Sequence, residues 1–273
     1  MNGGVYALLA VGFSLIFGVA RIVNIAHTAF YMLAAYCFYT LLVKGGLGFL
    51  LSGVIAVASV TLLSVLCYRL DHEAAVLIAT IALALIFQEL MLFTFGGHYL
   101  GIPSTLEGGV RIFGVSIPYQ RMLILAMAAA MLTLVWVLLY RTRLGLAIRA
   151  TANDLEVASL MGMNVHRVAM ATVAISVALA AIAGVVVAPV FVVDPFMWLA
   201  PLVTMLAIVV LGGLGSLKGS LIGALIIGYV EAITVFALPA GAYLKGAVAL
   251  GIMVVVLLAR PEGLFGVAFE EER

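Results

Sequence analysis

The residues best suited to recognise a partner lie in one polar stretch, residues 141–167, of an otherwise apolar chain. Asn153, Asp154 and Glu156 form a cluster of amide and carboxylate groups inside it. Four arginines accompany the cluster: Arg141, Arg143, Arg149 and Arg167. Such side chains form hydrogen bonds and ion pairs with another protein, but here they match no catalytic or metal-binding pattern. The stretch therefore predicts recognition of a partner.

A short helix is expected at the centre of this stretch. Asn153 is a favourable N-cap, and Glu156 three positions later completes a capping-box pattern. Gly162 stands where a left-handed residue ends a helix, which places the helix at residues 154–161. Its apolar side consists of Leu155, Ala158 and either Leu160 or Met161. Such a helix either docks into a groove of a partner protein or rests on the membrane surface.

A second group of polar residues begins at Arg21 and recurs at three- or four-residue spacing, as one face of a helix does. Its further members are Asn24, His27, Thr28 and Tyr31. Polar groups at membrane depth are costly and tend to face a bundle interior or a wet cavity. We therefore predict that the four line a solute pathway. Alternatively, Arg21 and Asn24 lie at the membrane interface and His27 is a packed residue.

Three more polar residues, Gln88, Glu89 and Glu231, interrupt apolar segments. Each is a candidate functional group, and Glu89 joins the predicted pathway. Each has a structural alternative, a hydrogen bond across helices or an ion pair with a lysine such as Lys245. The sequence contains no phosphate loop, no H-E-x-x-H and no G-x-S-x-G motif. We therefore predict no catalytic residue, no metal site and no cofactor held by this chain, which is not expected to be an enzyme.

The composition places most of the chain in lipid. Of its 273 residues, 66% are hydrophobic and 9% are charged, whereas a soluble domain has about 25% charged residues. The net charge of +1 argues against nucleic acid as a partner. Nine apolar segments approach the length of a membrane span: 3–20, 25–43, 47–68, 74–95, 122–140, 168–193, 198–217, 219–238 and 243–259. We predict an all-α, polytopic membrane protein with eight to ten spans.

The distribution of basic residues orients these segments. Nine of the thirteen Lys and Arg residues follow odd-numbered segments: Arg21, Arg69, Arg141, Arg143, Arg149, Arg167, Lys218, Arg260 and Arg273. The other four follow even-numbered segments: Lys44, Arg111, Arg121 and Lys245. By the positive-inside rule, the N-terminus lies outside, whereas the C-terminus and residues 141–167 lie in the cytoplasm. Residues 96–121 then face outward, with a short strand pair or an interfacial helix.

Glycines suggest how the segments pack and repeat. Gly215, Gly219 and Gly223 recur every four residues, a spacing that lets helices approach closely in lipid. The sequence Gly-Gly-Leu-Gly occurs at residues 45–48 and again at 212–215, before the third and eighth segments. An odd number of spans separates the two copies, which predicts a possible inverted repeat.

Four blocks of sequence, in order, resemble the permease subunits of branched-chain amino acid ABC importers. The first comprises residues 6–12 (YALLAVG), 21–27 (RIVNIAH) and 32–36 (MLAAY). The others are residues 141–165, 211–219 (LGGLGSLKG) and 260–266 (RPEGLFG). The chain departs from the family pattern at Leu155, Val157, Thr28 and Glu89.

The resemblance implies a single transmembrane permease domain over residues 1–273, in a bacterial or archaeal cytoplasmic membrane. It implies two ATP-binding partner subunits, a second related permease and a periplasmic or lipid-anchored solute-binding protein. ATP is then used by the partners, and residues 141–167 form the coupling loop. By the same resemblance, Asp154, Glu156, Ala158 and Gly162 are contact or hinge residues of the coupling. Asn153 and Met161, which the helix pattern places at the cap and on the apolar side, complete the predicted coupling set. Alternatives are a permease for urea or short amides, and a stand-alone secondary transporter or channel using Glu89 and Glu231.

Overall fold

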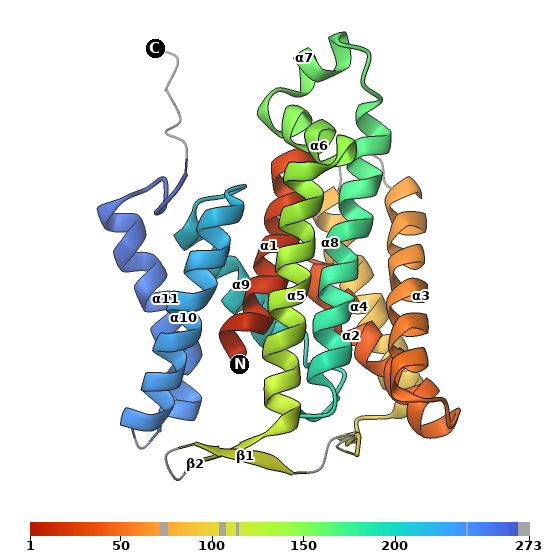
Figure 1. Cartoon of the computed structure of the whole chain (residues 1–273), viewed down its shortest axis with the longest axis vertical. Helices are drawn as coiled ribbons and strands as arrows, with labels where there is room; N and C mark the ends of the chain where they lie inside the picture. Colours follow the sequence, from red (N-terminus) through yellow and green to blue (C-terminus); the bar gives the residue numbers. More distant parts are fainter. Residues whose placement is uncertain (71–75, 104–107, 113–114, 239, 267–273) are drawn as a thin grey trace.

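The computed structural model describes residues 1–70, 76–103, 108–112, 115–238 and 240–266. In these residues the chain forms a helical bundle with one small hairpin at its end (Figure 1). The first half contains α1 (Asn2–Ala20), α2 (His27–Tyr39), the π-helical turn η1 (Thr40–Lys44), α3 (Phe49–Leu70), α4 (Val76–Phe95), β1 (Gly109–Ile112) and β2 (Val115–Pro118). The second contains α5 (Tyr119–Arg141), α6 (Arg143–Asn153), α7 (Leu155–Leu160), α8 (Val165–Val187), α9 (Leu199–Gly212), α10 (Leu217–Ala237) and α11 (Gly241–Ala259).

Each of the nine predicted segments contains one apolar helix, so the polytopic all-α fold is confirmed. Among the described residues, seven helices are long and apolar enough to cross a bilayer, and α2 and α9 are shorter. α2 begins only at His27, because Arg21 takes a left-handed conformation (φ 55°) and ends α1, and it changes to the π-helical turn η1 at Thr40. α8 ends at Val187 because Pro189 cannot continue a helix interior.

The order of helices repeats with inverted direction. α1, α2, α3 and α4 form a series in which a span is followed by a short helix and two more spans, and α8, α9, α10 and α11 form the same series. α1 runs toward the α7 end of the bundle, whereas α8 runs away from it (Figure 1). Both copies of Gly-Gly-Leu-Gly join the short helix to the next span. The architecture therefore agrees with the predicted inverted repeat.

Two hydrophobic clusters hold the bundle together. The first surrounds α1 and includes Phe13, Met205 and Ile208, while the second surrounds α2 and includes Phe30 and Tyr36. α1 packs against both α10 and α8, and α8 in turn packs against α2 and α3. α1 and α8, the first helix of each series, thus form the centre of the fold.

Glycine contacts bring α9 and α10 close together. A Cβ on Gly219 would collide with the backbone of Gly212, and one on Gly223 would lie 2.9 Å from the Ile208 carbonyl oxygen. Gly219 and Gly223 therefore both lie where α9 and α10 approach each other closely. Gly215 does not share this contact, because it lies in the turn before α10 with φ 80°. The helix pair uses Gly212 of α9 instead, which the four-residue spacing did not indicate.

Replacing Gly219 with alanine is expected to lower the melting temperature of the detergent-purified chain by several degrees. The added methyl group forces α9 and α10 apart, and overpacking of this kind typically costs about 1–3 kcal/mol. Gly251→Ala on α11 is the matched control, because beyond its own stretch of helix no atom of the described residues lies within 4 Å of its added Cβ. Thermal melts followed by size-exclusion chromatography measure both variants. Equal melting temperatures for the two would contradict the assigned contact.

The two ends of the bundle carry different structures (Figure 1). At one end, β1 and β2 pair antiparallel, with Val110 opposite Ile117, so residues 96–121 contain the strand pair. The backbones of Leu100 and Val193 also pair there, which ties this segment to the linker after α8. At the opposite end lie α6 and α7. We call the end with β1 and β2 the hairpin face and the opposite end, with α6 and α7, the helical face.

Candidate functional site

The predicted recognition helix exists, but its N-cap is Asp154. Asp154 has the extended conformation of an N-cap (φ −150°, ψ 114°), and its Oδ1 accepts from the Val157 amide at 2.9 Å. Asn153 is the last residue of α6, so the capping-box prediction was wrong. The sequence did not predict α6, the helix before α7. Because α6 extends to Asn153, the N-cap of α7 is the next residue, Asp154. α7 therefore covers Leu155–Leu160.

The predicted end of this helix is confirmed. Gly162 has φ 81°, and its amide donates to the Ser159 carbonyl at 2.9 Å. The next amide, on Met163, donates to the Ala158 carbonyl at 3.2 Å, which completes a Schellman motif. The Asn164 side chain then caps α8 by accepting from the Arg167 amide. Caps on both sides give α7 defined ends and a fixed direction.

α7 presents an apolar face away from the bundle. Leu160 is 86% exposed and Met161, the C-cap residue, is 77% exposed, and Val157 is exposed on the same side. Leu155 is exposed as well, on another side of the helix. Ala158 is only 3% exposed, so it faces inward and does not belong to this outer face. Asp154 and Glu156 are exposed beside the apolar residues. An apolar patch with carboxylates at its edge is typical of a protein-binding surface.

Three residues that were not among the predicted coupling residues hold α6 and α7 on the bundle. The Arg149 side chain donates to the Leu139 carbonyl at 3.1 Å and lies over the Tyr140 ring. Arg21, at the end of α1, donates to the Ala152 carbonyl at 3.2 Å. The Thr142 hydroxyl caps α6 by accepting from the Gly145 amide. These contacts link α7, through α6, to α5 and α1. The charge of the loop signalled Arg149 and the polar stripe began at Arg21, but the targets of both are backbone atoms that no sequence pattern identifies.

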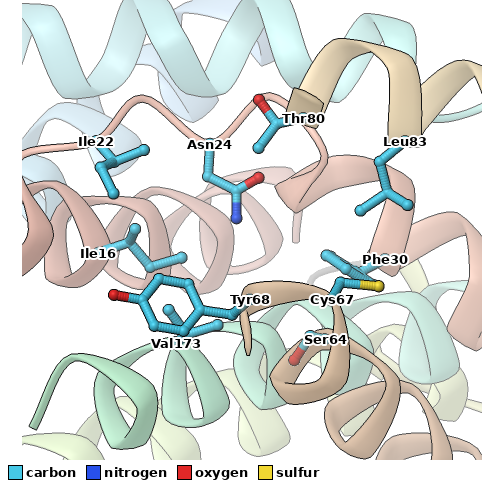
Figure 2. A pocket seen from close by; sticks show the side chains of 10 residues that line it. All are labelled: Ile16, Ile22, Asn24, Phe30, Ser64, Cys67, Tyr68, Thr80, Leu83 and Val173. Carbon is cyan, nitrogen blue, oxygen red and sulfur yellow. The ribbon is translucent and has the colours of Figure 1, made fainter. Parts of the chain in front are cut away.

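The predicted pathway residues do not share one cavity. Asn24 lines a cavity of about 30 Å³ between the α1–α2 linker, α3, α4 and α8. Figure 2 shows its amide directed toward the middle of the surrounding side chains, with Thr80 beside it. The Asn24 Oδ1 atom is buried and has no hydrogen-bond partner among the described residues. The cavity has room for a water molecule and not for an amino acid.

The remaining predicted residues separate further. His27 and Thr28 are fully buried, and the His27 ring packs against Phe13 at a centroid distance of 6.3 Å. Glu89 is exposed on α4, and its Oε1 accepts from the neighbouring Gln88 amide group. Tyr31 lines a second, much larger cavity of about 580 Å³. The four residues of the stripe therefore have three different surroundings. Asn24 lines a water-sized cavity, His27 and Thr28 are packed in the core, and Tyr31 lines the large cavity.

The large cavity brings together polar and charged residues from several helices, and part of its wall is exposed, because Phe191, Val192 and Val203 are 42–50% exposed. It lies between α1, α2, α9, α10, α11 and the linker after α8. Its polar members include Tyr6, Tyr31, Asp194, Glu231 and Lys245. Glu231, which the sequence indicated only as an isolated charge, here accepts from the Tyr6 hydroxyl at 2.9 Å. Among the described residues, no group of three or more His, Cys, Asp or Glu side chains is arranged to hold a metal ion.

Comparison with known proteins identifies the family. The model of the branched-chain amino acid transport system permease component matches residues 1–257. The chain is 31% identical to the high-affinity branched-chain amino acid transport system permease protein LivH of Escherichia coli K12, covering 97% of this chain and 92% of that protein. It is 30% identical to BraD of Pseudomonas aeruginosa, with the same coverage. The chain therefore belongs to this permease family.

A solved structure shows the same fold. PsaBC from Streptococcus pneumoniae, in complex with Fab, matches 96% of this chain and 91% of its own chain with a TM-score of 0.53. At 16% sequence identity, this likeness concerns the fold alone. Seven span-length apolar helices and membership of a permease family make the chain a multi-pass protein of the inner membrane.

Proposed function

We propose that this chain is the permease subunit of an ATP-driven importer of branched-chain amino acids. The observation that carries the proposal is α7, a helix capped at both ends, with its apolar face exposed at one end of the bundle. One of two separate ATP-binding subunits binds this face, and the other binds the corresponding face of the second permease. ATP is bound by these partners. The substrate class follows from relatives named as branched-chain amino acid permeases.

The charge distribution supports the orientation. The loop that holds α6 and α7 contains four of the thirteen basic residues, so we assign this end to the cytoplasm. The N-terminus is then outside and the C-terminus inside. The β1–β2 hairpin faces outward, where a solute-binding protein delivers its cargo. A second, related permease completes the pathway across the membrane.

The contacts of the helical face suggest how ATP drives transport. When the ATP-binding subunits close, they pull α7, and α6 moves with it. Arg149 transmits this movement to the end of α5, and Arg21 transmits it to the end of α1. Because α1 is at the centre of the bundle and contacts α8, α9 and α10, its displacement changes which end of the bundle is open. In this mechanism, alternating access results from the movement of rigid helices that are joined at defined contacts.

Purification of the tagged chain from its native membranes in mild detergent tests the proposal. We expect mass spectrometry to find two copies of an ATP-binding chain and a second permease, and the eluate to hydrolyse ATP. A chain that elutes alone, and that moves solute when reconstituted alone, would overturn the assignment. A ligand-binding assay on the associated binding protein then identifies the solute.

A further inference from the structure

The cavity that contains Tyr31 has the size and composition of a small-molecule site. Its volume of about 580 Å³ falls within the roughly 300–1,000 Å³ typical of ligand sites. Its walls are mostly apolar, and they include Val5, Val187, Phe191, Met197 and Leu250. Charged groups stand at only a few points. Such a cavity favours a ligand that combines an aliphatic body with charged ends.

Glu231 is the deepest charged group of this cavity. Its side chain is 2% exposed, and Oε2 accepts from the Tyr6 hydroxyl. The other oxygen, Oε1, is buried and has no hydrogen-bond partner among the described residues. A buried carboxylate without a cation is costly at membrane depth. An ammonium group in the cavity would remove that cost by donating to Oε1.

Lys245 supplies a positive charge in the same cavity. It is half-buried and lies in the first turns of α11, a helix that begins at the hairpin end of the bundle (Figure 1). Among the described residues, no ion pair joins Lys245 to Glu231 or to Asp194, although all three line the cavity. The Asp194 Oδ1 atom already accepts from the Phe196 amide at 2.9 Å. Glu231 and Lys245 thus remain as separated, opposite charges facing one space.

The location of the cavity fits a transport site. α2 contributes Tyr31 and α9 contributes Thr204, so both short helices of the inverted repeat reach it. Transporters commonly place solute sites where discontinuous helices of two repeats meet. Asp194 and Phe191 come from the linker after α8, on the hairpin side. The cavity therefore includes residues from the hairpin side of the bundle.

We propose that this cavity binds a zwitterionic amino acid with an aliphatic side chain. Glu231 accepts hydrogen bonds from its ammonium group, Lys245 donates to its carboxylate, and the apolar wall contacts its side chain. The substrate class rests on the proposed function. The new element is a solute site inside this one subunit, with Glu231 as its specificity-determining residue.

The test uses the assembled complex in lipid nanodiscs and measures binding of radiolabelled L-leucine. Glu231→Gln keeps an oxygen that accepts from Tyr6 but removes the negative charge, so a purely structural role for Glu231 predicts no change. We expect at least a tenfold weaker affinity for leucine. We also expect loss of selectivity against 4-methylpentanoate, which lacks the ammonium group. That selectivity is a readout that packing alone does not change.

Lys245→Met is the second variant, and Lys44→Met is its matched control. Lys44 lies over the Phe95 ring, outside the cavity, at 4.6 Å from the ring centroid. We expect Lys245→Met to weaken leucine binding at least tenfold and Lys44→Met to bind as the unmodified complex does. Unchanged affinity and selectivity in both cavity variants would overturn the site while leaving the importer assignment intact. An unmodified complex that hydrolyses ATP but neither binds nor imports leucine would overturn the proposed substrate and the site together.

Discussion

Replacing both Leu160 and Met161 with aspartate is expected to reduce ATP-dependent uptake at least about tenfold. These two side chains, at the last residue of α7 and at its C-cap, are the most exposed apolar groups of its outer face. Burying one such side chain contributes about 1.5–3 kcal/mol, and every 1.4 kcal/mol is a factor of about ten in affinity. Two charges placed against an apolar groove therefore weaken the contact with the ATP-binding subunits. Insertion into the membrane should not change, because both positions lie outside the spans.

The measurement compares uptake with the amount of ATP-binding subunit that copurifies. Leu160→Met combined with Met161→Leu is the matched control, because both positions stay apolar and keep nearly the same volume. We expect the control to retain uptake and association. If the double aspartate variant imported solute normally at normal expression, α7 would not be the docking helix.

The second large effect is expected at Gly145, where α6 turns back against the end of α5. A Cβ at this position would collide with the carbonyl oxygens of Leu138 and Leu139. Gly145→Val therefore pushes α6 away from α5. This breaks the Thr142 cap and the hydrogen bond from Arg149 to Leu139. We expect the variant to insert in the membrane, to lose the ATP-binding subunits and to import at less than about a tenth of the normal rate.

Gly251→Val is the control for this substitution, since it adds the same side chain to a helix at a position with open space. Copurification and uptake are measured for both variants at matched expression. Normal association of Gly145→Val with the ATP-binding subunits would show that α7 does not depend on the α5–α6 corner for its position.

The sequence was sufficient for the spans because lipid imposes one dominant requirement, a continuous apolar run of helical length. It was less reliable where a local break decides the outcome. α2 begins only at His27 because of a left-handed Arg21, and α9 is short because of the linker between α8 and α9. The left-handed conformation of Arg21 cannot be recognised from a hydropathy pattern. The two copies of Gly-Gly-Leu-Gly did indicate the repeat, because they mark the same turn in each half.

Single positions of the helical face were harder to predict. Asn153 and Asp154 are both good N-caps, and the choice between them depends on where α6 ends. Gly162 was predictable because a left-handed helix end favours glycine strongly. The sequence placed Ala158 on the apolar side of α7, but in the structure it faces the bundle. The orientation was not predictable, because six residues are too few to define which side of a helix is outward.

The solute site was not predictable as a unit because its members are far apart in the chain. Tyr6, Tyr31, Glu231 and Lys245 lie on α1, α2, α10 and α11, and only the packing of these helices brings them to one cavity. The polar stripe that begins at Arg21 combined residues with different surroundings, because the chain is irregular before α2. An isolated charge in a span, such as Glu231, was the useful signal.

The central claim is that ATP hydrolysed on the α7 side drives import through this chain. Its most direct test is leucine uptake by proteoliposomes that contain the purified complex, with the binding protein outside and ATP inside. We predict accumulation of leucine only when ATP is present in the lumen, and none by liposomes that contain this chain alone. Accumulation by the chain alone, without ATP, would contradict the account and identify a secondary transporter.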